Sequence, residues 1–468
     1  MPEARRVKGE TPQVIIPRQG MPPETQIVYR VGAVPILRPL RALRYGRDHL
    51  HLLDDLISPA VRGEPTDRTT IGEVHPHNIR RLVRGDTGPL ATAEDPAFTH
   101  AARLLARWKE DGVLTRDGRP ALYVYEQRTE HTQRRGIVGL VRLDREGNAR
   151  LLPHEVARGG STETLREQLA ATRAQLSLVM AIVPDRSGVL ADYLEGHPGQ
   201  NDVEVFDGKG VQNRIWRDED PAVHLRLTDA LRDEPAVIAD GHHRVEAALQ
   251  HQAERAGDKP VTRERPYDYV MTLLVPQNEP GLVSKPTHRV CEKLGATSQR
   301  LLDGLDQLFV ITPLERAAAQ EFLAGDGIRF VLVRPGRVLG LTLRSDAAAA
   351  QRALETLPEA LRHVEPAALG ALVLDPISAA EAGAAGRSVN VDTGGAASNS
   401  TFSHNRTSAE DVLNRAFDGE VDAAFLLRPV PSHQVVSVAE AGQLMPPKST
   451  NFHPKPIKGL LINSLVSF

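Results

Sequence analysis

The sequence predicts a mixed fold of the α+β class, in which helices and strands share a core. An apolar, β-branched run at residues 236–239 ends in a tight turn and is followed by a helix-like stretch. Two runs of strand-forming residues between positions 121 and 143 flank a polar turn. In residues 292–376, predicted Ala- and Leu-rich helices alternate with short strands. Hydrophobic residues make up 41% of the chain and charged residues 25%, which is ordinary for a globular protein.

The N-terminal half contains both kinds of element. Residues 1–26 are rich in Pro, Arg and Glu, so we expect a flexible N-terminal tail. Further on, Ala101, Leu105 and Trp108 recur at helical spacing, and Gly112 supplies a stop. The elements predicted in this half are a strand at 27–31, a helix at 98–112, a hairpin from 121–127 and 135–143, a helix at 164–177 and a strand at 178–183.

Changes in amino-acid composition divide the chain after residue 26 into three regions. Residues 27–291 are predicted to form an N-terminal region with its core at about 143–275. Residues 292–400 form an α/β subdomain with an Ala/Gly-rich connection, and residues 401–468 form a C-terminal segment that returns to the core. The elements predicted in these parts are strands at 267–275, 329–333 and 422–429, and a helix near 436–443.

Charge and cysteine content restrict the classes of function. The formal net charge of −3 gives no broad basic surface, so we expect no nucleic-acid partner. The single cysteine, Cys291, excludes an internal disulfide and a Cys-rich zinc site, and we interpret it as a small buried hydrophobe. The sequence has no apolar run long enough to span a membrane, and its first residues do not resemble a secretion signal. We therefore expect a cytoplasmic protein.

The turn after residue 239 carries the strongest chemical signal. Asp240 and Gly241 end the predicted strand, and His242, His243 and Arg244 begin the predicted helix. The first N–H groups of a helix have no partner within it, and the helix dipole places partial positive charge there. Arg244 adds a planar donor fork, so the turn is predicted to bind phosphate. The alternative is a polar turn in which Asp240 only caps the helix.

Several motifs in this order identify the chain as resembling a large bacterial and archaeal family of unknown function, from about residue 34 to the end. They are Tyr123-Val124-Tyr125-Glu126-Gln127, Leu152-Pro153-His154-Glu155, Ala239 to Arg244, Thr287-His288-Arg289, and Met445 through Pro456 with Gly459-Leu460. The Pro153-His154-Glu155 and Asp240 to Arg244 pair also resembles SerK-type free-serine kinases of the ParB/sulfiredoxin superfamily. This resemblance implies a ParB/sulfiredoxin-like core with an inserted or appended α/β subdomain.

The resemblance further implies a small-molecule kinase that phosphorylates the hydroxyl of serine or a related hydroxylated amino acid. Such a reaction needs a phosphate cradle, a divalent metal and a proton acceptor, so we expect Mg²⁺ with ATP, ADP or pyrophosphate as the donor. The residues assigned are Glu155 and His243 for catalysis; Asp240, Gly241, His242, His243, Arg244, Lys448, Ser449 and Thr450 for phosphate; Thr287, His288, Arg289 and Trp216 for substrate; and Asp240 for the metal.

Two other classes of function stay open at this point. One is a nucleotide- or phosphate-binding module of the ParB type without turnover, and the other is a metal-dependent hydrolase that uses His242 and His243. Relatives carry a Pro-Pro-Tyr-Asp-Val segment where this chain has residues 56–62 without the Tyr and Asp. This departure puts the activity or its substrate in question.

Two expectations concern the arrangement of the site. Glu155 and Asp240 both follow apolar strands, so we expect them to face one cleft of a mixed core. Lys448 and Lys455 lie in a stiff, Pro-rich and basic segment, which we expect to fold back and border the phosphate site.

Overall fold

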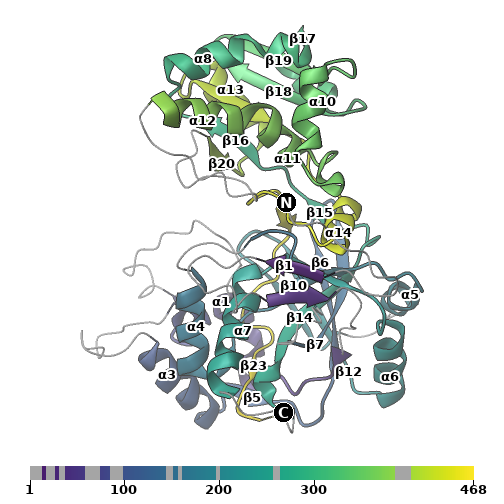
Figure 1. The fold of residues 1–468 in the computed structure, drawn as a ribbon. Coiled ribbons are helices and arrows are strands. Elements are labelled where there is room, and N and C mark those ends of the chain that lie inside the picture. The colour runs from purple at the N-terminus through teal and green to yellow at the C-terminus, as the bar shows by residue number, and fades with distance from the viewer. Residues whose placement is uncertain are drawn as a thin grey trace, which may run out of the picture. The chain divides into compact units, whose positions relative to one another are not determined.

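The computed structural model describes residues 13–16, 27–30, 37–57, 74–84, 98–143, 151–156, 161–196, 201–256, 264–384 and 402–467. The chain forms two compact units, which are described separately (Figure 1). The first unit comprises Met1–Pro153, Ala157–Val283 and Pro454–Phe468, and the second comprises His154–Val156 and Ser284–His453. The predicted segment at 56–62 and the connection up to residue 400 lie largely outside the described residues.

A mixed sheet forms the centre of the first unit. Most neighbouring strands are antiparallel, whereas β10 is parallel to β14 and β13 is parallel to β8. The strand order is β11 (Val203–Phe206), β12 (Gln212–Asp218), β6 (Leu122–Arg128), β7 (Gln133–Arg142), β14 (Tyr269–Pro276), β10 (Val179–Val183), β13 (Ala236–Asp240) and β8 (Leu151–Leu152), with β3 (Leu37–Arg38) also paired to β7. The predicted hairpin is confirmed, since β6 and β7 pair directly.

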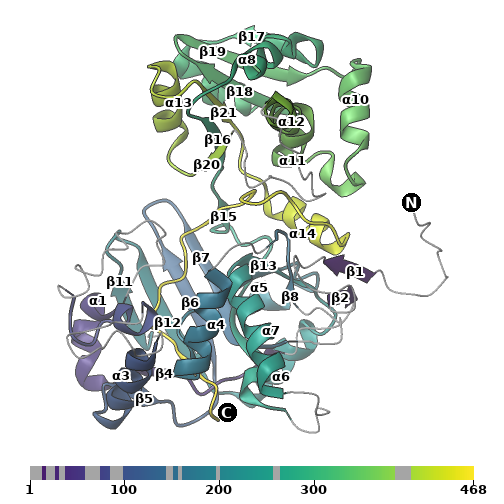
Figure 2. The same ribbon diagram turned by 60° about the vertical axis from the view of Figure 1, so that its left-hand side comes forward.

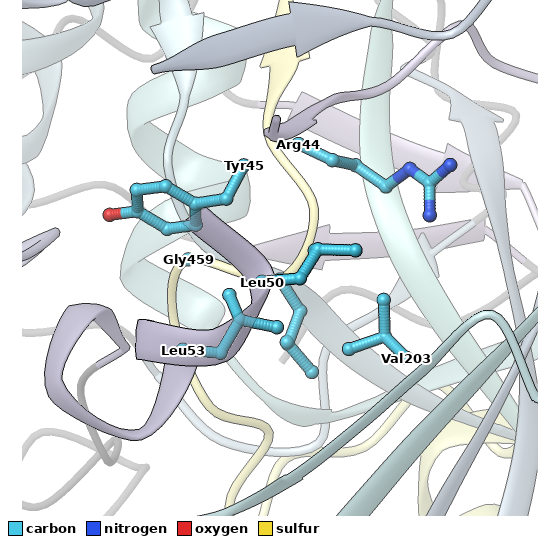
Figure 3. A pocket seen from close by; sticks show the side chains of 7 residues that line it. Arg44, Tyr45, Leu50, Leu53, Val203 and Gly459 are labelled. Carbon is cyan, nitrogen blue, oxygen red and sulfur yellow. The ribbon is translucent and has the colours of Figure 1, made fainter. Parts of the chain in front are cut away.

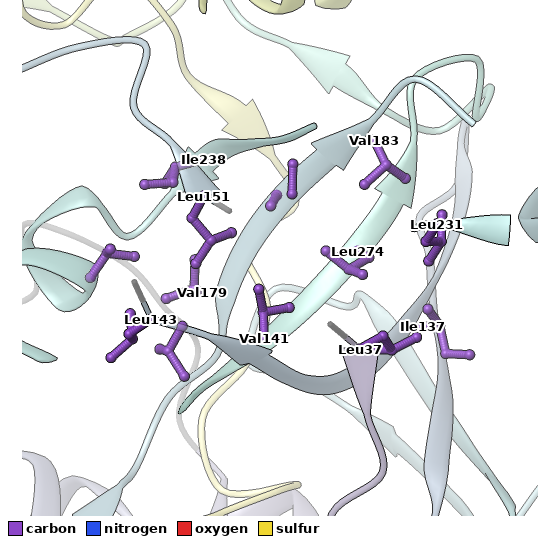
Figure 4. Close-up of a cluster of buried hydrophobic side chains, with 14 of the residues drawn as sticks. Leu37, Ile137, Val141, Leu143, Leu151, Val179, Val183, Leu231, Ile238 and Leu274 are labelled. Atoms are coloured by element: carbon purple, nitrogen blue, oxygen red, sulfur yellow. The ribbon is translucent and has the colours of Figure 1, made fainter. Parts of the chain in front are cut away.

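Alternating side chains of these strands form one hydrophobic core with the helices (Figure 4). Val179, Ala181 and Val183 of β10 belong to this core, together with Ile238 of β13 and Leu274 of β14. Their spacing of two residues places them on one face of the sheet. The helices that pack here are α4 (Ser161–Thr172), α5 (Val189–Glu195), α6 (Pro221–Ala230) and α7 (His242–Ala256), as Figure 2 shows.

Segments from both ends of the chain add to the first unit. The backbone N–H of Leu43 donates to the carbonyl of Ile462 at 2.9 Å, and that of Ile457 donates to the hydroxyl of Tyr125 at 3.1 Å. The remaining described elements are β4 (Leu43–Tyr45) paired with β5 (Leu114–Arg116), β9 (Ala174–Gln175) paired with β23 (Asn463–Ser464), and the helices α1 (Leu53–Leu56), α2 (Arg80–Val83) and α3 (Thr99–Glu110).

Local predictions differ from the structure at two places in this unit. The tail predicted over residues 1–26 contains a strand, β1 (Gln13–Ile16), which pairs with β2 (Ile27–Arg30). The helix predicted at 164–177 begins at Ser161 and ends at Thr172. Arg173 adopts a left-handed backbone with φ of 48°, and the following strand β9 pairs with the C-terminal strand β23. A long-range strand pairing therefore replaces the last predicted helical turn.

The second unit contains an antiparallel sheet, and its helices contribute to two hydrophobic cores. Its strand order is β17 (Phe309–Pro313), β19 (Arg337–Leu343), β18 (Arg329–Arg334), β21 (Ala423–Leu426), β16 (His288–Cys291) and β20 (Ser403–Asn405). One core contains residues of α8 (Ala296–Asp303), α10 (Ala348–Glu355), α11 (Glu365–Leu369) and α12 (Asp375–Ala384), and the other contains residues of α9 (Ala319–Leu323) and α13 (Ala409–Phe417).

The units divide the chain differently from the predicted domains. The second unit begins at Ser284 rather than at residue 292, and the boundary lies in the short strand β15 (Val283–Ser284). Residues 402–453, including α14 (Ser432–Glu440) and β22 (Phe452–His453), belong to the second unit, so only residues 454–468 return to the first. The mixed α+β class is confirmed, and of the two predicted alternatives, inserted or appended, the second unit is inserted between Val283 and Pro454 of the first.

Candidate functional site

The predicted phosphate turn has the conformation that its sequence indicates. β13 ends at Asp240, and α7 begins at His242. Gly241 between them has φ of 106°, a region that residues with a Cβ rarely adopt. A Cβ at Gly241 would also lie 3.0 Å from Nε of Arg244. The Gly241 carbonyl accepts the N–H groups of Arg244 and Val245 at 2.8 and 3.0 Å, so it starts the helix.

Asp240 binds two cations at this turn. Lys455 Nζ lies 2.6 Å from Asp240 Oδ1, and the guanidinium of Arg244 donates to Oδ2. All three side chains are largely buried, with relative exposures between 17% and 23%. Burial alone would raise the pKa of the Asp240 carboxyl, but the charges and hydrogen bonds of Lys455 and Arg244 outweigh this effect and lower it. The turn therefore carries two cations against one carboxylate.

A buried arginine holds Lys455 in place. Arg134 is 1% exposed and donates to the Gln127 side chain and, at 2.6 Å, to the carbonyl of Pro454. Gln127 in turn donates to the carbonyl of Lys455 at 3.1 Å. Burial lowers the pKa of Arg134 to about 10, while Tyr125, Glu279 and Asp240 oppose the shift. Because Arg134 interacts with Asp240 electrostatically, it adds a third positive charge near the turn.

The two histidines of the turn belong to no potential metal-binding group among the described residues. His243 Nδ1 lies 2.9 Å from the Thr162 hydroxyl on α4, and His242 is 8% exposed. Within the described ranges, no group of three or more His, Cys, Asp or Glu side chains could hold a metal ion. This part of the chain therefore offers no support for the metal-dependent hydrolase.

Asp240 does not fit the predicted role of magnesium ligand in this arrangement. A divalent ion needs carboxylate oxygens, yet Oδ1 of Asp240 accepts from Lys455 and Oδ2 accepts from Arg244. An ion at either oxygen would have to displace a cationic side chain. We therefore interpret Asp240 as the residue that positions Arg244 and Lys455.

Replacing Asp240 with Asn is expected to lower the free energy of unfolding by about 1–3 kcal/mol at pH 7, because two largely buried cations lose their anion. Since the pKa of Asp240 is lowered by folding, its contribution is complete above the unfolded value of 3.8 and is lost as the pH falls below it. Urea unfolding of parent and variant between pH 7 and pH 3 measures this difference. If the difference in unfolding free energy between parent and variant stayed constant below pH 4, the stabilising role of the Asp240 carboxylate would be contradicted.

The second unit brings two distant motifs together around Glu155. The N–H of Met445 donates to the carbonyl of His154 at 2.8 Å, and His154 Nε2 lies 2.8 Å from the Thr450 hydroxyl. The N–H of Lys448, which has φ of 59°, donates to Glu155 Oε2 at 2.9 Å. The segment around Lys448 therefore fixes the position of the Glu155 carboxylate.

The other predicted site residues of the second unit are mainly buried. Thr287, His288 and Arg289 have exposures of 3% or less. His288 Nδ1 accepts the N–H of Leu427 at 3.3 Å, and burial followed by the charge of Arg289 lowers the pKa of His288 to about 4. Ser449 is 2% exposed and donates to the carbonyl of Pro446 at 2.6 Å. His288 and Ser449 are therefore held by main-chain hydrogen bonds within the second unit.

Trp216 lies within β12 rather than after it, and its side chain packs against the hydrophobic core of the first unit. Arg44 forms an ion pair with Asp117 at 2.7 Å, and Arg217 joins the same carboxylate at 3.2 Å. A small pocket beside Arg44 and Leu50 contains none of the predicted site residues (Figure 3). We interpret this region as structural.

The predicted site residues thus form one group in each unit. The phosphate turn belongs to the first unit, and Glu155 with the Lys448 segment belongs to the second. A common cleft for Glu155 and Asp240 stays a prediction. The C-terminal segment does reach the turn, through Lys455. Sequence reasoning noted Lys455 as part of a basic segment but assigned it no role, and it left out Arg134.

Comparison with known proteins identifies the family. The sequence pattern of a family described as "Protein of unknown function (DUF1015)" matches residues 37–360. The chain belongs to this family. Membership in DUF1015 agrees with the resemblance drawn from the ordered motifs, and no curated protein sequence matches the chain.

Solved structures similar to this DUF1015 member include a conserved hypothetical protein from Pyrococcus furiosus, at 14% identity and a TM-score of 0.31, over 66% of this chain and 88% of that one. A free serine kinase in complex with AMP has 13% identity and a TM-score of 0.32, and the match covers 65% of this chain and 83% of the kinase chain. C-terminally truncated SbnI from Staphylococcus aureus has 11% identity and a TM-score of 0.33, and the match covers 70% of this chain and 87% of the SbnI chain. Scores this low transfer no activity to this chain. No helix in the described part of the DUF1015 chain is long and apolar enough to cross a membrane.

Proposed function

We propose that this protein is a small-molecule phosphotransferase that moves a phosphoryl group to the hydroxyl of serine or a related hydroxylated amino acid. The observation that carries the proposal is the convergence of Arg244 and Lys455 at the first turn of α7. Arginine has five N–H donors and lysine three, so each can hold Asp240 and still donate to phosphate. The partial positive charge of the helix dipole at the start of α7 favours the same ligand.

The donor in this proposal is ATP, ADP or pyrophosphate, because each presents the same phosphate oxygens to the turn. The acceptor hydroxyl attacks the terminal phosphorus, the bond between that phosphorus and the leaving oxygen breaks, and Glu155 takes the hydroxyl proton. Glu155 suits this role because the N–H of Lys448 donates to its Oε2 at 2.9 Å and so fixes the position of the carboxylate. Its motif also resembles that of the serine kinases.

A phosphate-binding module without turnover is the second candidate. Two observations favour it. The family segment at residues 56–62 lacks its Tyr and Asp here, and both oxygens of Asp240 are engaged by cations rather than available to Mg²⁺. The two candidates share the phosphate turn and differ only in whether a product forms.

Incubation of the full chain with Mg²⁺, each of the three donors and pooled hydroxylated metabolites tests the proposal. Mass spectrometry is expected to show a phosphorylated hydroxy amino acid, and loss of donor should match the gain of product. A parallel incubation without protein gives the background. Donor binding by calorimetry without any phosphorylated product would exclude the kinase and assign the binding module.

A further inference from the structure

A group of basic side chains in the second unit interacts electrostatically with Glu155. We define this basic cluster as Arg289, His404, Arg406 and Lys448. Arg289 on β16 and His404 on β20 are directly opposed in an antiparallel pair, so their side chains leave the same face of the sheet. Arg406 follows β20 and donates to the carbonyl of Thr450 at 3.1 Å. Lys448 is joined to Glu155 through its backbone N–H.

Arg289 is the most unusual member of the cluster. Its side chain is 3% exposed, and among the described residues its guanidinium donates to the main-chain carbonyls of Thr287 and His288, at 2.7 and 3.4 Å. In the part of the chain that the structure describes, it forms no salt bridge with a carboxylate. Burial and the charge of Arg406 lower the pKa of Arg289 to about 10, and Glu155 opposes the shift. A buried cation of this kind ordinarily has an anionic partner.

The cluster as a whole has more positive than negative charge. Arg289, Arg406 and Lys448 oppose the one carboxylate of Glu155. His404 is accessible to solvent, yet the surrounding protein and the charges of Arg289, Lys448 and Arg406 lower its pKa to about 4. His404 is therefore neutral near pH 7, mainly because the surrounding protein removes water from it, and the nearby cations add to this effect. In addition, the buried hydroxyl of Thr287, two positions before Arg289, has no hydrogen-bond partner among the described residues.

We propose that the basic cluster is an oxyanion site that takes the carboxylate of a small hydroxylated acid. Guanidinium groups match carboxylate geometry, and the exposed His404 provides access from solvent. Inorganic phosphate presents similar oxygens and shares this chemistry. The anion site stands on the cluster alone, whereas its assignment to the acceptor of phosphoryl transfer rests on the proposed function.

The His404 imidazole provides a direct measurement of occupancy. In the full chain labelled at histidine, the His404 signal is assigned with His404→Asn and its pH titration is followed by NMR. Saturating L-serine, D-glycerate or inorganic phosphate is expected to raise the pKa of His404 by about half a unit to one unit, because the bound anion offsets nearby positive charge. His433 on α14, which is exposed, serves as the internal reference and should not move.

Two variants test whether the basic cluster binds the anion that shifts the His404 titration. Arg406→Gln is expected to weaken anion binding by about tenfold to a hundredfold, as expected for loss of a charge-assisted hydrogen bond. Arg415→Gln, which removes a partly exposed arginine paired with Glu420 on the same unit, should leave binding unchanged. Because the His404 titration is measured in the parent protein, the measurement of occupancy does not depend on the folding of Arg406→Gln.

Each outcome decides one part of the inference. If no anion moves the His404 titration, or if chloride moves it equally at the same ionic strength, the oxyanion site is wrong. Tighter binding of serine and glycerate than of phosphate supports the carboxylate, and the reverse order overturns it. Phosphorylated product without a His404 response overturns this site but keeps the kinase. A His404 response without product keeps the site and overturns the kinase.

Discussion

Replacing Glu155 with Gln is expected to lower phosphoryl transfer by about two to four orders of magnitude while donor affinity stays unchanged. The amide of Gln cannot take the hydroxyl proton. It still offers an oxygen to the N–H of Lys448, which donates to Glu155 at 2.9 Å, so the surrounding segment should keep its structure. Product formation measured by mass spectrometry and donor affinity measured by calorimetry separate the two effects.

The matched control for this variant is Glu355→Gln. Glu355 is an exposed acid at the end of α10 in the same unit, so its loss changes the net charge equally without affecting the candidate base. Circular dichroism checks that both variants are folded. Full turnover in Glu155→Gln would remove Glu155 as the base, and loss of donor affinity would show that it acts in binding instead.

The local structure of the phosphate turn could be predicted because its determinants are adjacent in sequence. The β-branched run up to Ala239 forms β13, and Gly241 supplies the left-handed turn before α7. The ion pair between Asp240 and Arg244 also has a local signal, since the two residues are four positions apart. Short-range sterics and hydrogen bonding therefore account for this part of the site.

The partners that come from distant segments could not be predicted in the same way. Lys455 is 215 residues from Asp240, and Lys448 is 293 residues from Glu155. Their positions depend on how the C-terminal segment packs, which the periodicity of that segment does not encode. Arg134 was missed for a related reason, because an arginine in a strand is ordinarily exposed and here it is buried against Gln127 and Pro454.

The extent of the second unit shows the same limit. Residues 402–453 were predicted to return to the first core, yet β20 and β21 pair on either side of β16. β21 is an apolar strand of four residues and is suited to the interior of any sheet. Only its pairing with β16 and β18, which lie far away in the sequence, decides which sheet it enters.

The second large effect is expected when the cations of the phosphate turn are removed. Arg244→Ala and Lys455→Met should each weaken donor binding by about tenfold to a hundredfold, because each removes a charge-assisted hydrogen bond to phosphate. In both variants Asp240 keeps one cationic partner, so the turn should remain folded. Calorimetric titration with each donor at two salt concentrations measures the loss, and the salt dependence should weaken along with the affinity.

Two controls match these variants in charge and location. Arg255→Ala removes an exposed arginine from the last turn of the same helix, and Lys209→Met removes an exposed lysine from the same unit. Both are expected to bind donor like the parent protein. Parent-like affinity in Arg244→Ala and in Lys455→Met would instead mean that the charges at the turn only hold Asp240. In that case the phosphate interpretation of this turn, and the function proposed from it, would both be wrong.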